Sequence, residues 1–145
     1  MFGVTTRLSF IEPQLASPVD QPPEGIHWIH ELKHDGYRCQ VLLERGQARL
    51  FTRNGHDWSE RYPSIICAAS NLQCRSAIID GEAIVQDANG ASDFDSLNSA
   101  LRWRPECIIL YAFDLMHLDG KNLRQRALSD RRSILKVLLG SDEES

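Results

Sequence analysis

The amino-acid sequence predicts an α+β fold with largely antiparallel strands flanked by helices. Short runs rich in valine, isoleucine and leucine alternate with tight turns built from glycine, asparagine and aspartate, which is the pattern of neighbouring antiparallel strands. Between them lie segments whose apolar residues recur at every third or fourth position, as on the buried face of a helix. With 145 residues, of which 42% are hydrophobic and 25% charged, the chain has the size and composition of one globular domain.

We expect three regions along the chain. Residues 1–25 contain four of the six prolines and form an irregular lead-in arm. Residues 26–140 form the folded domain, and residues 141–145 are a polar tail. Within the domain, a first strand is expected over Ile26–His34.

Turns delimit the strands that follow. Tyr37–Glu44 and Ala48–Arg53 are separated by the turn Arg45-Gly46-Gln47, which predicts a hairpin. The β-branched run Arg75–Gln86 is closed by a strong turn signal, Asp87-Ala88-Asn89-Gly90. The last strand is expected over Cys107–Met116, and a loop through Asp119-Gly120 follows it.

Three helices are expected beside these strands. Tyr62–Leu72 suits a short helix, because Pro63 is tolerated in a first helical turn. A second helix is expected over Asp93–Arg102, and a last one has Ser129 as its N-cap and ends at Gly140. Apolar residues mark the buried face of the second helix (Phe94, Leu97, Leu101) and of the last one (Ile134, Leu135, Leu138).

Charge, cysteines and histidines limit the classes of function. A net charge of −4 argues against a broad nucleic-acid clamp. The cysteines form no C-x-x-C pair, so we expect reduced thiols and neither a disulfide framework nor a zinc site. His27, His30 and His34 are not expected to bind a metal, since a strand would turn the first away from the other two. Nothing resembles a signal peptide or a membrane span, so the expectation is a cytoplasmic protein without a membrane partner.

A basic cluster lies near the end of the chain. Between Lys121 and Lys136 there are six basic residues and one acid, Asp130. Such a run is either the solvated face of a helix or a patch that faces phosphate groups. Composition does not choose between these two interpretations.

The segment Glu31–Arg38, with the sequence Glu-Leu-Lys-His-Asp-Gly-Tyr-Arg, places a lysine between two acids. On a strand, Glu31, Lys33 and Asp35 would share one face. A lysine in this setting is either a member of a structural ion pair or, when its pKa is lowered, a nucleophile. The segment by itself leaves both interpretations open.

Two further polar sites interrupt apolar runs. Asp80-Gly81-Glu82 places two carboxylates on one face of a strand, where they could hold Mg²⁺ or a ribose hydroxyl. The simpler interpretation is a pair of exposed acids at a strand-end turn. Phe113 and Asp114 lie at the end of another apolar run, where a lone phenylalanine is usually a core residue.

Taken together and in order, these sites resemble the adenylation domain of ATP-dependent DNA ligases, within the covalent nucleotidyltransferase superfamily. Four motifs carry the resemblance: Lys33-x-Asp35-Gly36-x-Arg38, Phe51-Thr52-Arg53-Asn54-Gly55, Asp80-Gly81-Glu82 and Tyr111-Ala112-Phe113-Asp114-Leu115. Three flanking segments, Ile11–Ala16, Trp58–Pro63 and Leu128–Arg132, are similar to the ligase domain of bacterial ligase D. The resemblance runs from about residue 10 to residue 139. It implies an ATP-grasp-like nucleotidyltransferase fold, of which the chain would hold the N-terminal portion.

The resemblance also implies roles for individual residues. Lys33 would attack the α-phosphate of ATP, expel pyrophosphate and carry AMP as a covalent adduct. The nucleotide would be bound by five residues: Glu31 near the adenine, Arg38 and Arg53 at ribose or phosphate oxygens, Glu82 at the ribose or the metal shell, and Phe113 stacked on the adenine. Asp35 and Asp80 would support them. Because neighbouring carboxylates raise the pKa of an amine, we expect Mg²⁺ or Mn²⁺ to offset their charge and that of the phosphates.

The substrates and partners follow from the same resemblance. AMP would pass to a DNA 5′-phosphate, and nicked or broken double-stranded DNA would be sealed in repair or end joining. A Ku-like end-binding protein is a partner that the family alone implies.

Two alternatives remain open. Neither the superfamily's Glu-Gly-x-Val motif, nor its later pair of lysines, nor an oligonucleotide-binding domain appears, so we expect a C-terminally truncated domain that does not ligate autonomously. A catalytically incompetent fragment that at most binds nucleotide or a partner is one alternative. Another lysine nucleotidyltransferase, such as an RNA ligase or a capping enzyme, is the second.

Overall fold

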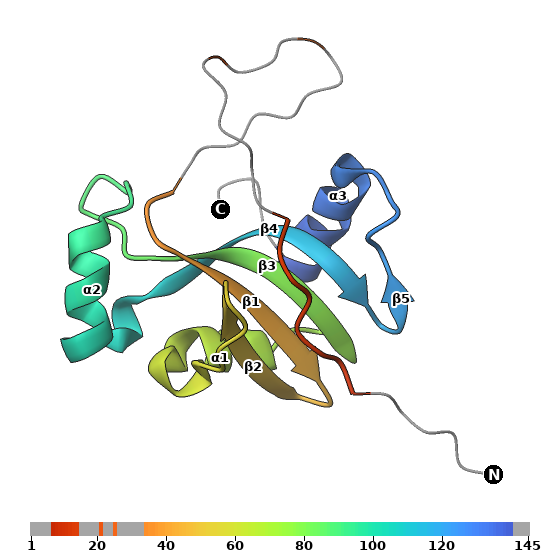
Figure 1. Cartoon of the computed structure of the whole chain (residues 1–145), viewed down its shortest axis with the longest axis horizontal. Coiled ribbons are helices and arrows are strands. Elements are labelled where there is room, and N and C mark those ends of the chain that lie inside the picture. The colour runs from red at the N-terminus through yellow and green to blue at the C-terminus, as the bar shows by residue number, and fades with distance from the viewer. Residues whose placement is uncertain (1–6, 15–20, 22–24, 26–33, 141–145) are drawn as a thin grey trace.

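A five-stranded sheet in the order β2-β1-β3-β4-β5 forms the centre of the molecule (Figure 1). The structure is a computed structural model that describes residues 7–14, 21, 25 and 34–140. The strands are β1 (Tyr37–Glu44), β2 (Gln47–Thr52), β3 (Ser76–Ile84), β4 (Ile109–Leu118) and β5 (Lys121–Asn122). Every neighbouring pair is antiparallel, which confirms the predicted α+β class.

The hairpin of β1 and β2 closes through a two-residue turn. Glu44 pairs with Gln47, and both turn residues have positive φ, 50° at Arg45 and 77° at Gly46. This is the backbone twist that two-residue hairpins favour, and glycine adopts it without a steric cost. The predicted hairpin is therefore confirmed, with β2 shifted by one residue towards the turn.

Within the described residues three α-helices flank the sheet: α1 (Pro63–Ser70), α2 (Phe94–Trp103) and α3 (Leu128–Leu139). Asp93, predicted as helical, is the N-cap of α2 and accepts a hydrogen bond from the Ser96 backbone N–H at 3.1 Å. The prediction of Ser129 as the N-cap of α3 is wrong. The N-cap is Ala127, two residues earlier, so that the helix begins at Leu128 without a side-chain cap.

Short elements account for other differences from the sequence prediction. Cys107 ends a 3₁₀ turn (Pro105–Cys107) and is not part of β4, whereas β4 extends two residues beyond Met116. A second 3₁₀ turn (Ser59–Arg61) precedes α1, and the two-residue β5 was not predicted. All four cysteines are unpaired.

The two faces of the sheet are covered differently. On one face, which we call the core face, Val41, Ile79 and Leu115 join Ile65 of α1 and Leu135 of α3 in the main hydrophobic cluster. On the other face a smaller cluster of Leu42, Ile78 and Met116 packs against Leu8 and Ile11 of the arm. We call this second face the arm face.

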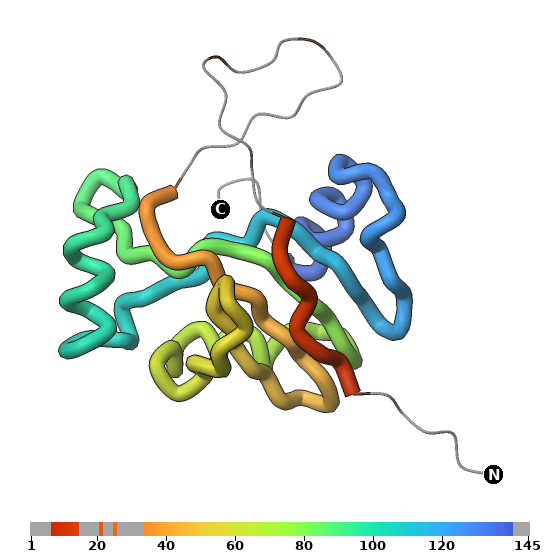
Figure 2. Tube along the Cα trace, viewed as in Figure 1, coloured from red at the N-terminus to blue at the C-terminus, as the bar shows by residue number. Residues whose placement is uncertain are grey.

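Residues 7–14 cross the sheet on the viewer's side (Figure 2). The buried Gln40 side chain fixes them through two hydrogen bonds to Ile11. Gln40 Nε2 donates to the carbonyl oxygen at 2.7 Å, and its Oε1 accepts from the backbone N–H at 2.8 Å. The part of the predicted lead-in arm formed by residues 7–14 is therefore packed against the sheet. The strand expected over 26–34 lies outside the described residues except for His34, which is irregular.

Candidate functional site

The strand register brings the sequence motifs together on the arm face. Arg38 of β1 pairs with Glu82 of β3, which in turn pairs with Tyr111 of β4. Two positions along, Asp80 pairs with Asp114. Because side chains at alternate positions share a face, Arg38, Asp80 and Glu82 lie on the same side of the sheet. Motifs that are more than forty residues apart in the sequence are thereby neighbours.

Arg38 is held in place by Asp80. Its Nε donates to Oδ1 of Asp80 at 2.7 Å and its Nη2 donates to Oδ2 at 2.5 Å, a bidentate pair. Asp80 is only 3% exposed. The hydrogen bond that Arg38 donates to Asp80 is the main cause that raises the pKa of Arg38, although burial acts against it. Asp80 is thus neither an exposed strand-end acid nor a free carboxylate ready for Mg²⁺.

An irregularity in β4 sets the position of Phe113. Asp80 pairs with Asp114 and Gly81 pairs with Ala112, so Phe113 is the extra residue of a bulge. The Arg38 guanidinium lies over the Phe113 ring, with 4.9 Å between its carbon and the ring centroid. Gly81 permits this close approach of β4, because a Cβ there would lie 2.6 Å from the carbonyl oxygen of Tyr111. Phe113 is therefore a residue of the site face and not simply a core aromatic.

Asp114 connects the site to α3. Its carboxylate forms an ion pair with Arg131 Nε at 3.1 Å and accepts the backbone N–H of Leu115 at 2.8 Å. Burial nevertheless raises the pKa of Asp114, because desolvation outweighs the attraction of Arg131. One member of the basic cluster is consequently a half-buried structural residue and not part of a solvated helix face.

The chain directly after Lys33 is fixed by three contacts. The His34 ring lies on Tyr111, with centroids 4.0 Å apart. The backbone N–H of Asp35 donates to Ser92 Oγ at 2.7 Å. At Gly36 a Cβ would lie 2.0 Å from the carbonyl oxygen of Ala83, so only glycine fits there. These interactions fix the position of His34–Gly36, which we call the pinned turn. The chain leads from it directly into β1, beside Glu82.

The start of β1 is tied to α2 as well. The Tyr37 hydroxyl donates to Asn98 Oδ1 at 2.6 Å, and its ring meets Phe94 edge-on with centroids 5.1 Å apart. Since Ser92 lies just before Asp93, the N-cap of α2, this helix and the residues ahead of it contact both Asp35 and Tyr37. Phe94 was predicted to be buried, yet it is 41% exposed because it caps Tyr37 at the edge of the molecule.

Arg53 lies at the same end of the sheet. It follows the last pair of the β1–β2 ladder, Cys39 with Thr52, and is exposed in the turn that the Gly55 N–H closes onto the Thr52 carbonyl at 2.9 Å. The backbone of Arg53 therefore lies close to the end of β1 that carries Arg38. Glu31 and Lys33 lie outside the described residues.

The carboxylates of the site limit how a metal ion could be held. Within the described residues no group of three histidine, cysteine or acidic side chains could hold an ion. Both oxygens of Asp80 bind Arg38 and the Asp114 carboxylate pairs with Arg131, while the strand register places Glu82 between Arg38 and Tyr111 on the same face. One carboxylate together with phosphate oxygens is an ordinary set of Mg²⁺ ligands. The described donors fit a nucleotide-bound cation and do not fit an all-protein metal site.

Several contacts of the site were missed by sequence reasoning. The Arg131–Asp114 ion pair, the His34–Tyr111 contact and the Ser92 hydrogen bond each join separate segments. Of these three contacts, only the ion pair had a signal in the sequence, because Arg131 belongs to the basic cluster that the sequence analysis singled out.

Among the described residues, no helix is long and apolar enough to cross a membrane.

Comparisons with known proteins agree on one family. Residues 13–145 match the family described as "ATP dependent DNA ligase domain". Over 98% of its length, the chain is 45% identical to the multifunctional non-homologous end joining protein LigD of Pseudomonas aeruginosa. It spans 17% of that protein. Over 77% of its length it is 37% identical to the LigD of Mycobacterium tuberculosis, a non-homologous end joining DNA repair protein, and spans 14% of it.

Solved structures extend this agreement to the fold. The ligase domain of M. tuberculosis LigD superposes with a TM-score of 0.67 at 34% identity, over 76% of this chain and 36% of that chain. A mycobacterial DNA ligase D complexed with ATP and MES gives the same values. The chain thus spans less than a fifth of its P. aeruginosa relative and little more than a third of these ligase structures.

Proposed function

This chain belongs to the ATP-dependent DNA ligase family, and we propose that its part in the reaction is to bind ATP on the arm face and to accept AMP on Lys33. The observation that carries the proposal is the register that gathers Arg38, Glu82 and Phe113 on one face. The turn that follows Lys33 is pinned beside the same three residues.

The described side chains suit a nucleotide. Phe113 offers an aromatic face on which adenine can stack. Arg38 binds Asp80 through Nε and Nη2, so its pairing does not use Nη1, and that group can donate to a ribose or phosphate oxygen. Because the guanidinium is already oriented, little of its conformational freedom is lost when a ligand binds. Arg53 would add a second cation at the same end of the sheet.

The pinned turn would orient the nucleophile. Lys33 precedes His34 directly, so the contacts of His34, Asp35 and Gly36 limit the positions from which the amine can approach the α-phosphate. Attack on that phosphorus would form an N–P bond and break the bond to pyrophosphate, which leaves with its electron pair. A divalent cation held by Glu82 and the phosphates would supply neutralisation of phosphate charge. Glu31 would contact the adenine.

The later steps belong to the whole ligase. We propose that AMP passes from Lys33 to a DNA 5′-phosphate and that a nick is then sealed during end joining, as the names of the LigD relatives suggest. Broken or nicked double-stranded DNA would be the substrate, with a Ku-like end-binding protein as a partner and a cytoplasmic location. The chain covers only 36% of the solved ligase domains, so we expect the isolated chain to adenylate slowly and not to seal DNA.

Incubation with Mg²⁺ and α-labelled ATP tests the proposal. A slow adduct, labile in acid, is expected on the wild-type chain and none on Lys33→Ala, because an amine is required. Lys121→Ala is the matched control, since that lysine lies in β5 at the other end of β4 and should leave the adduct unchanged.

Two results would contradict the proposal in different ways. An adduct that persists in Lys33→Ala would show that another residue accepts AMP. ATP binding to the wild-type chain without any adduct would favour the second candidate, a nucleotide-binding fragment without catalysis. That candidate is motivated by the same 36% coverage.

A further inference from the structure

An arginine-rich cleft lies at the end of the sheet opposite the proposed nucleotide site. At this end the hairpin turn after β1, the start of β3 and the turn between β4 and β5 meet (Figure 1). The cleft has a volume of about 550 Å³, and a smaller cleft of about 220 Å³ adjoins it and shares Glu44 and Arg45 with it. We call the two together the hairpin-end cleft. Its arginines and acids are Arg7, Glu44, Arg45, Arg49, Arg75 and Asp119.

Both acids of the hairpin-end cleft are bound within the protein. Glu44 Oε1 accepts a hydrogen bond from the backbone N–H of Leu8 at 3.0 Å. Asp119 Oδ1 accepts hydrogen bonds from the backbone N–H groups of Arg75 at 2.7 Å and Ser76 at 3.2 Å, which lower the pKa of its carboxyl group. The two carboxylates therefore serve the fold. One holds the arm, and the other joins the turn after β4 to the start of β3.

Three of the four arginines point outward. Arg49 is the exception, because its Nη2 donates to the carbonyl oxygen of Leu8 at 2.8 Å. Arg7, Arg45 and Arg75 are exposed, and no ion pair within the described residues involves them. The backbone N–H of Arg45 donates to the carbonyl oxygen of Arg75 at 3.2 Å, so these two cations start from adjacent backbone. Clustered cations without counter-charges create a positive potential that attracts anions.

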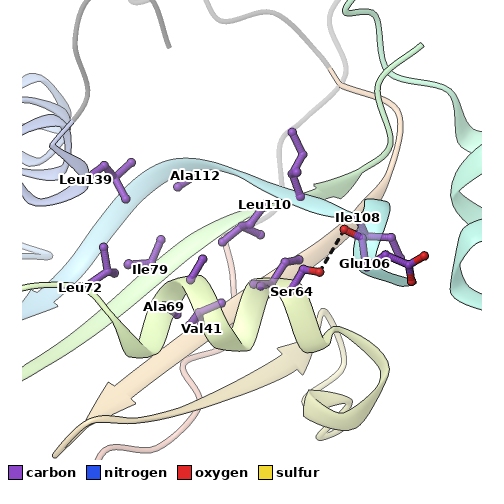
Figure 3. Close-up of a pocket in the computed structure, with 13 residues that line it drawn as sticks. Val41, Ser64, Ala69, Leu72, Ile79, Glu106, Ile108, Leu110, Ala112 and Leu139 are labelled. Carbon is purple, nitrogen blue, oxygen red and sulfur yellow. Dashed lines mark hydrogen bonds between the residues drawn. The ribbon is translucent and has the colours of Figure 1, made fainter. Parts of the chain in front are cut away.

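The hairpin-end cleft differs in this respect from the apolar groove on the core face. That groove lies between α1 and β4 and has a volume of about 260 Å³ (Figure 3). Its lining is aliphatic apart from Ser64 and Glu106, and Ser64 Oγ donates to the carbonyl oxygen of Glu106 at 3.0 Å. None of the described residues that line the groove is a cation. An anion is therefore attracted to the hairpin-end cleft and not to the groove.

The exposed arginines suit a row of phosphate groups. A guanidinium presents a planar fork of donors that matches two phosphate oxygens, and it stays charged at physiological pH. Arg7 belongs to the arm, Arg45 to the hairpin turn, and Arg75 directly precedes β3. Because they come from three segments and are exposed, they form a rim and do not enclose one small anion. The backbone of duplex DNA, with a charge for about every 1.7 Å of its axis, matches such a rim.

The hairpin-end cleft and the proposed nucleotide site lie on the same face of the sheet. Glu44 follows Arg38 by six positions on β1, and Ser76 precedes Asp80 by four on β3, so all four side chains point to the arm face. From Arg38 to Arg45 the chain advances seven residues, or about 23 Å at about 3.3 Å per residue. The same length holds about seven base pairs of duplex DNA, which rise by about 3.4 Å each. One straight duplex along β1 can therefore reach both ends of the strand.

We propose that the hairpin-end cleft binds the phosphate backbone of duplex DNA, about seven base pairs from the position of the nucleotide site. Arg7, Arg45 and Arg75 contact phosphate groups and no bases, so binding does not depend on base sequence. The choice of DNA over another polyanion rests on the proposed function, whereas the phosphate chemistry does not. The contact requires no ATP, so its failure and the failure of adenylation are separate results.

Fluorescence anisotropy with a labelled, unnicked duplex of 20 base pairs, in the absence of ATP, tests the cleft. The double variant Arg45→Gln/Arg75→Gln should bind the duplex at least tenfold more weakly than the wild-type chain at 100 mM salt. The slope of log affinity against log salt concentration should become shallower by about two, because two phosphate contacts are lost. Glutamine keeps the aliphatic stem of each side chain and removes only the charge.

Arg104→Gln is the matched control. Arg104 is an exposed arginine at the C-cap of α2 and lines neither part of the hairpin-end cleft. The loss of its charge should leave both the affinity and the salt slope unchanged. Thermal unfolding of each variant checks that substitutions at these exposed positions leave the fold intact. Competition with inorganic phosphate at constant ionic strength separates a DNA backbone from a free anion as the source of the phosphate.

Three results would overturn the proposal. One is the absence of duplex binding by the wild-type chain at 50 mM salt. Another is the same affinity in the double variant as in Arg104→Gln, because the position of the arginines would then be irrelevant. The third is full displacement of the duplex by micromolar inorganic phosphate, because this would assign the cleft to a small free anion.

Discussion

The two faces of one sheet differ in what holds their side chains. On the core face, Leu115 and Ile79 are buried in the main hydrophobic cluster, beside an apolar groove. On the arm face, Asp80 is equally buried but is paired with a cation. Burial alone therefore does not tell a structural position from a functional one. The feature that indicates a functional position is a buried acid whose cationic partner lies beside an aromatic ring.

The largest expected difference between the faces is in packing. Leu115→Ala should lower the free energy of unfolding by about 4 kcal/mol, because it opens a cavity in the main cluster. Met116→Ala, on the adjacent residue and the opposite face, should cost about 2 kcal/mol, since its cluster is small and covered by the arm. Urea unfolding of both variants measures the difference. A larger loss for Met116→Ala would show that the arm face carries the core.

Removal of the buried charge should have the next largest effect. Asp80→Asn should cost about 2–3 kcal/mol of unfolding free energy, because it leaves Arg38 half-buried without its counter-charge. Glu44→Gln is the matched control on the same face. It weakens an open pair with Arg49 at 3.5 Å and keeps an oxygen for the Leu8 N–H, so about 0.5 kcal/mol or less is expected. Equal costs in urea unfolding would contradict the special status of the Arg38–Asp80 pair.

Burial of a thiol on the core face should also make the stability of the chain depend on pH in the alkaline range. Burial raises the pKa of the Cys39 thiol from its ordinary value of 9.0 to about 12. As the pH rises through 9, the thiol loses its proton in the unfolded state but keeps it in the folded state. The contribution of Cys39 to the free energy of unfolding is therefore fully present below pH 9 and declines above it. The expected slope is about 1.4 kcal/mol per pH unit up to about pH 12. Urea unfolding at pH 8, 9 and 10 measures it.

Cys39→Ala provides the control for this slope. The variant should lose most of the decline between pH 9 and pH 10, where the raised pKa of Tyr62 contributes little. An unchanged decline in the variant would assign the effect to other groups.

The smallest effect concerns the pinned turn on the arm face. His34→Ala should slow adenylation about fivefold, which corresponds to ~1 kcal/mol, because the contact with Tyr111 is lost. His34→Phe should restore the rate, since the aromatic contact with Tyr111 fixes the turn. Single-turnover adduct formation at saturating ATP separates the rate from ATP affinity. A rate that falls equally in both variants would show that the imidazole itself is needed.

The sequence was informative where periodicity decides the structure. Alternation in β3 correctly placed Asp80 and Glu82 on one face, and the turn chemistry of Arg45-Gly46 located the hairpin. The apolar spacing in α3 identified Ile134, Leu135 and Leu138 as its buried face. Local rules suffice for these features because the residues that determine them are close in the chain.

The remaining features depend on residues that are distant in the chain. Asp80 meets Arg38 across 42 positions, and no local pattern shows that its carboxylate is already bound. The bulge at Phe113 follows from the fit of β4 onto Gly81 of β3. The assignment of Ser129 as a cap failed because the N-cap position is taken by Ala127, whose side chain forms no capping hydrogen bond. Glu31 and Lys33 lie outside the described residues, so their roles remain predictions.

Side-chain NMR with Mg²⁺ and ATP tests most directly whether the two faces have separate functions. The backbone of β3 and β4 is common to both faces, so its signals cannot separate them. Aromatic and methyl signals come from side chains on one face and are therefore the appropriate probes. We expect ATP to shift the ring signals of Phe113 and Tyr111 and to leave the methyl signals of Val41, Ile65 and Leu72, which line the groove on the core face, unchanged. Shifts centred on those three methyl groups, or no shift at saturating ATP, would contradict the assignment of nucleotide binding to the arm face.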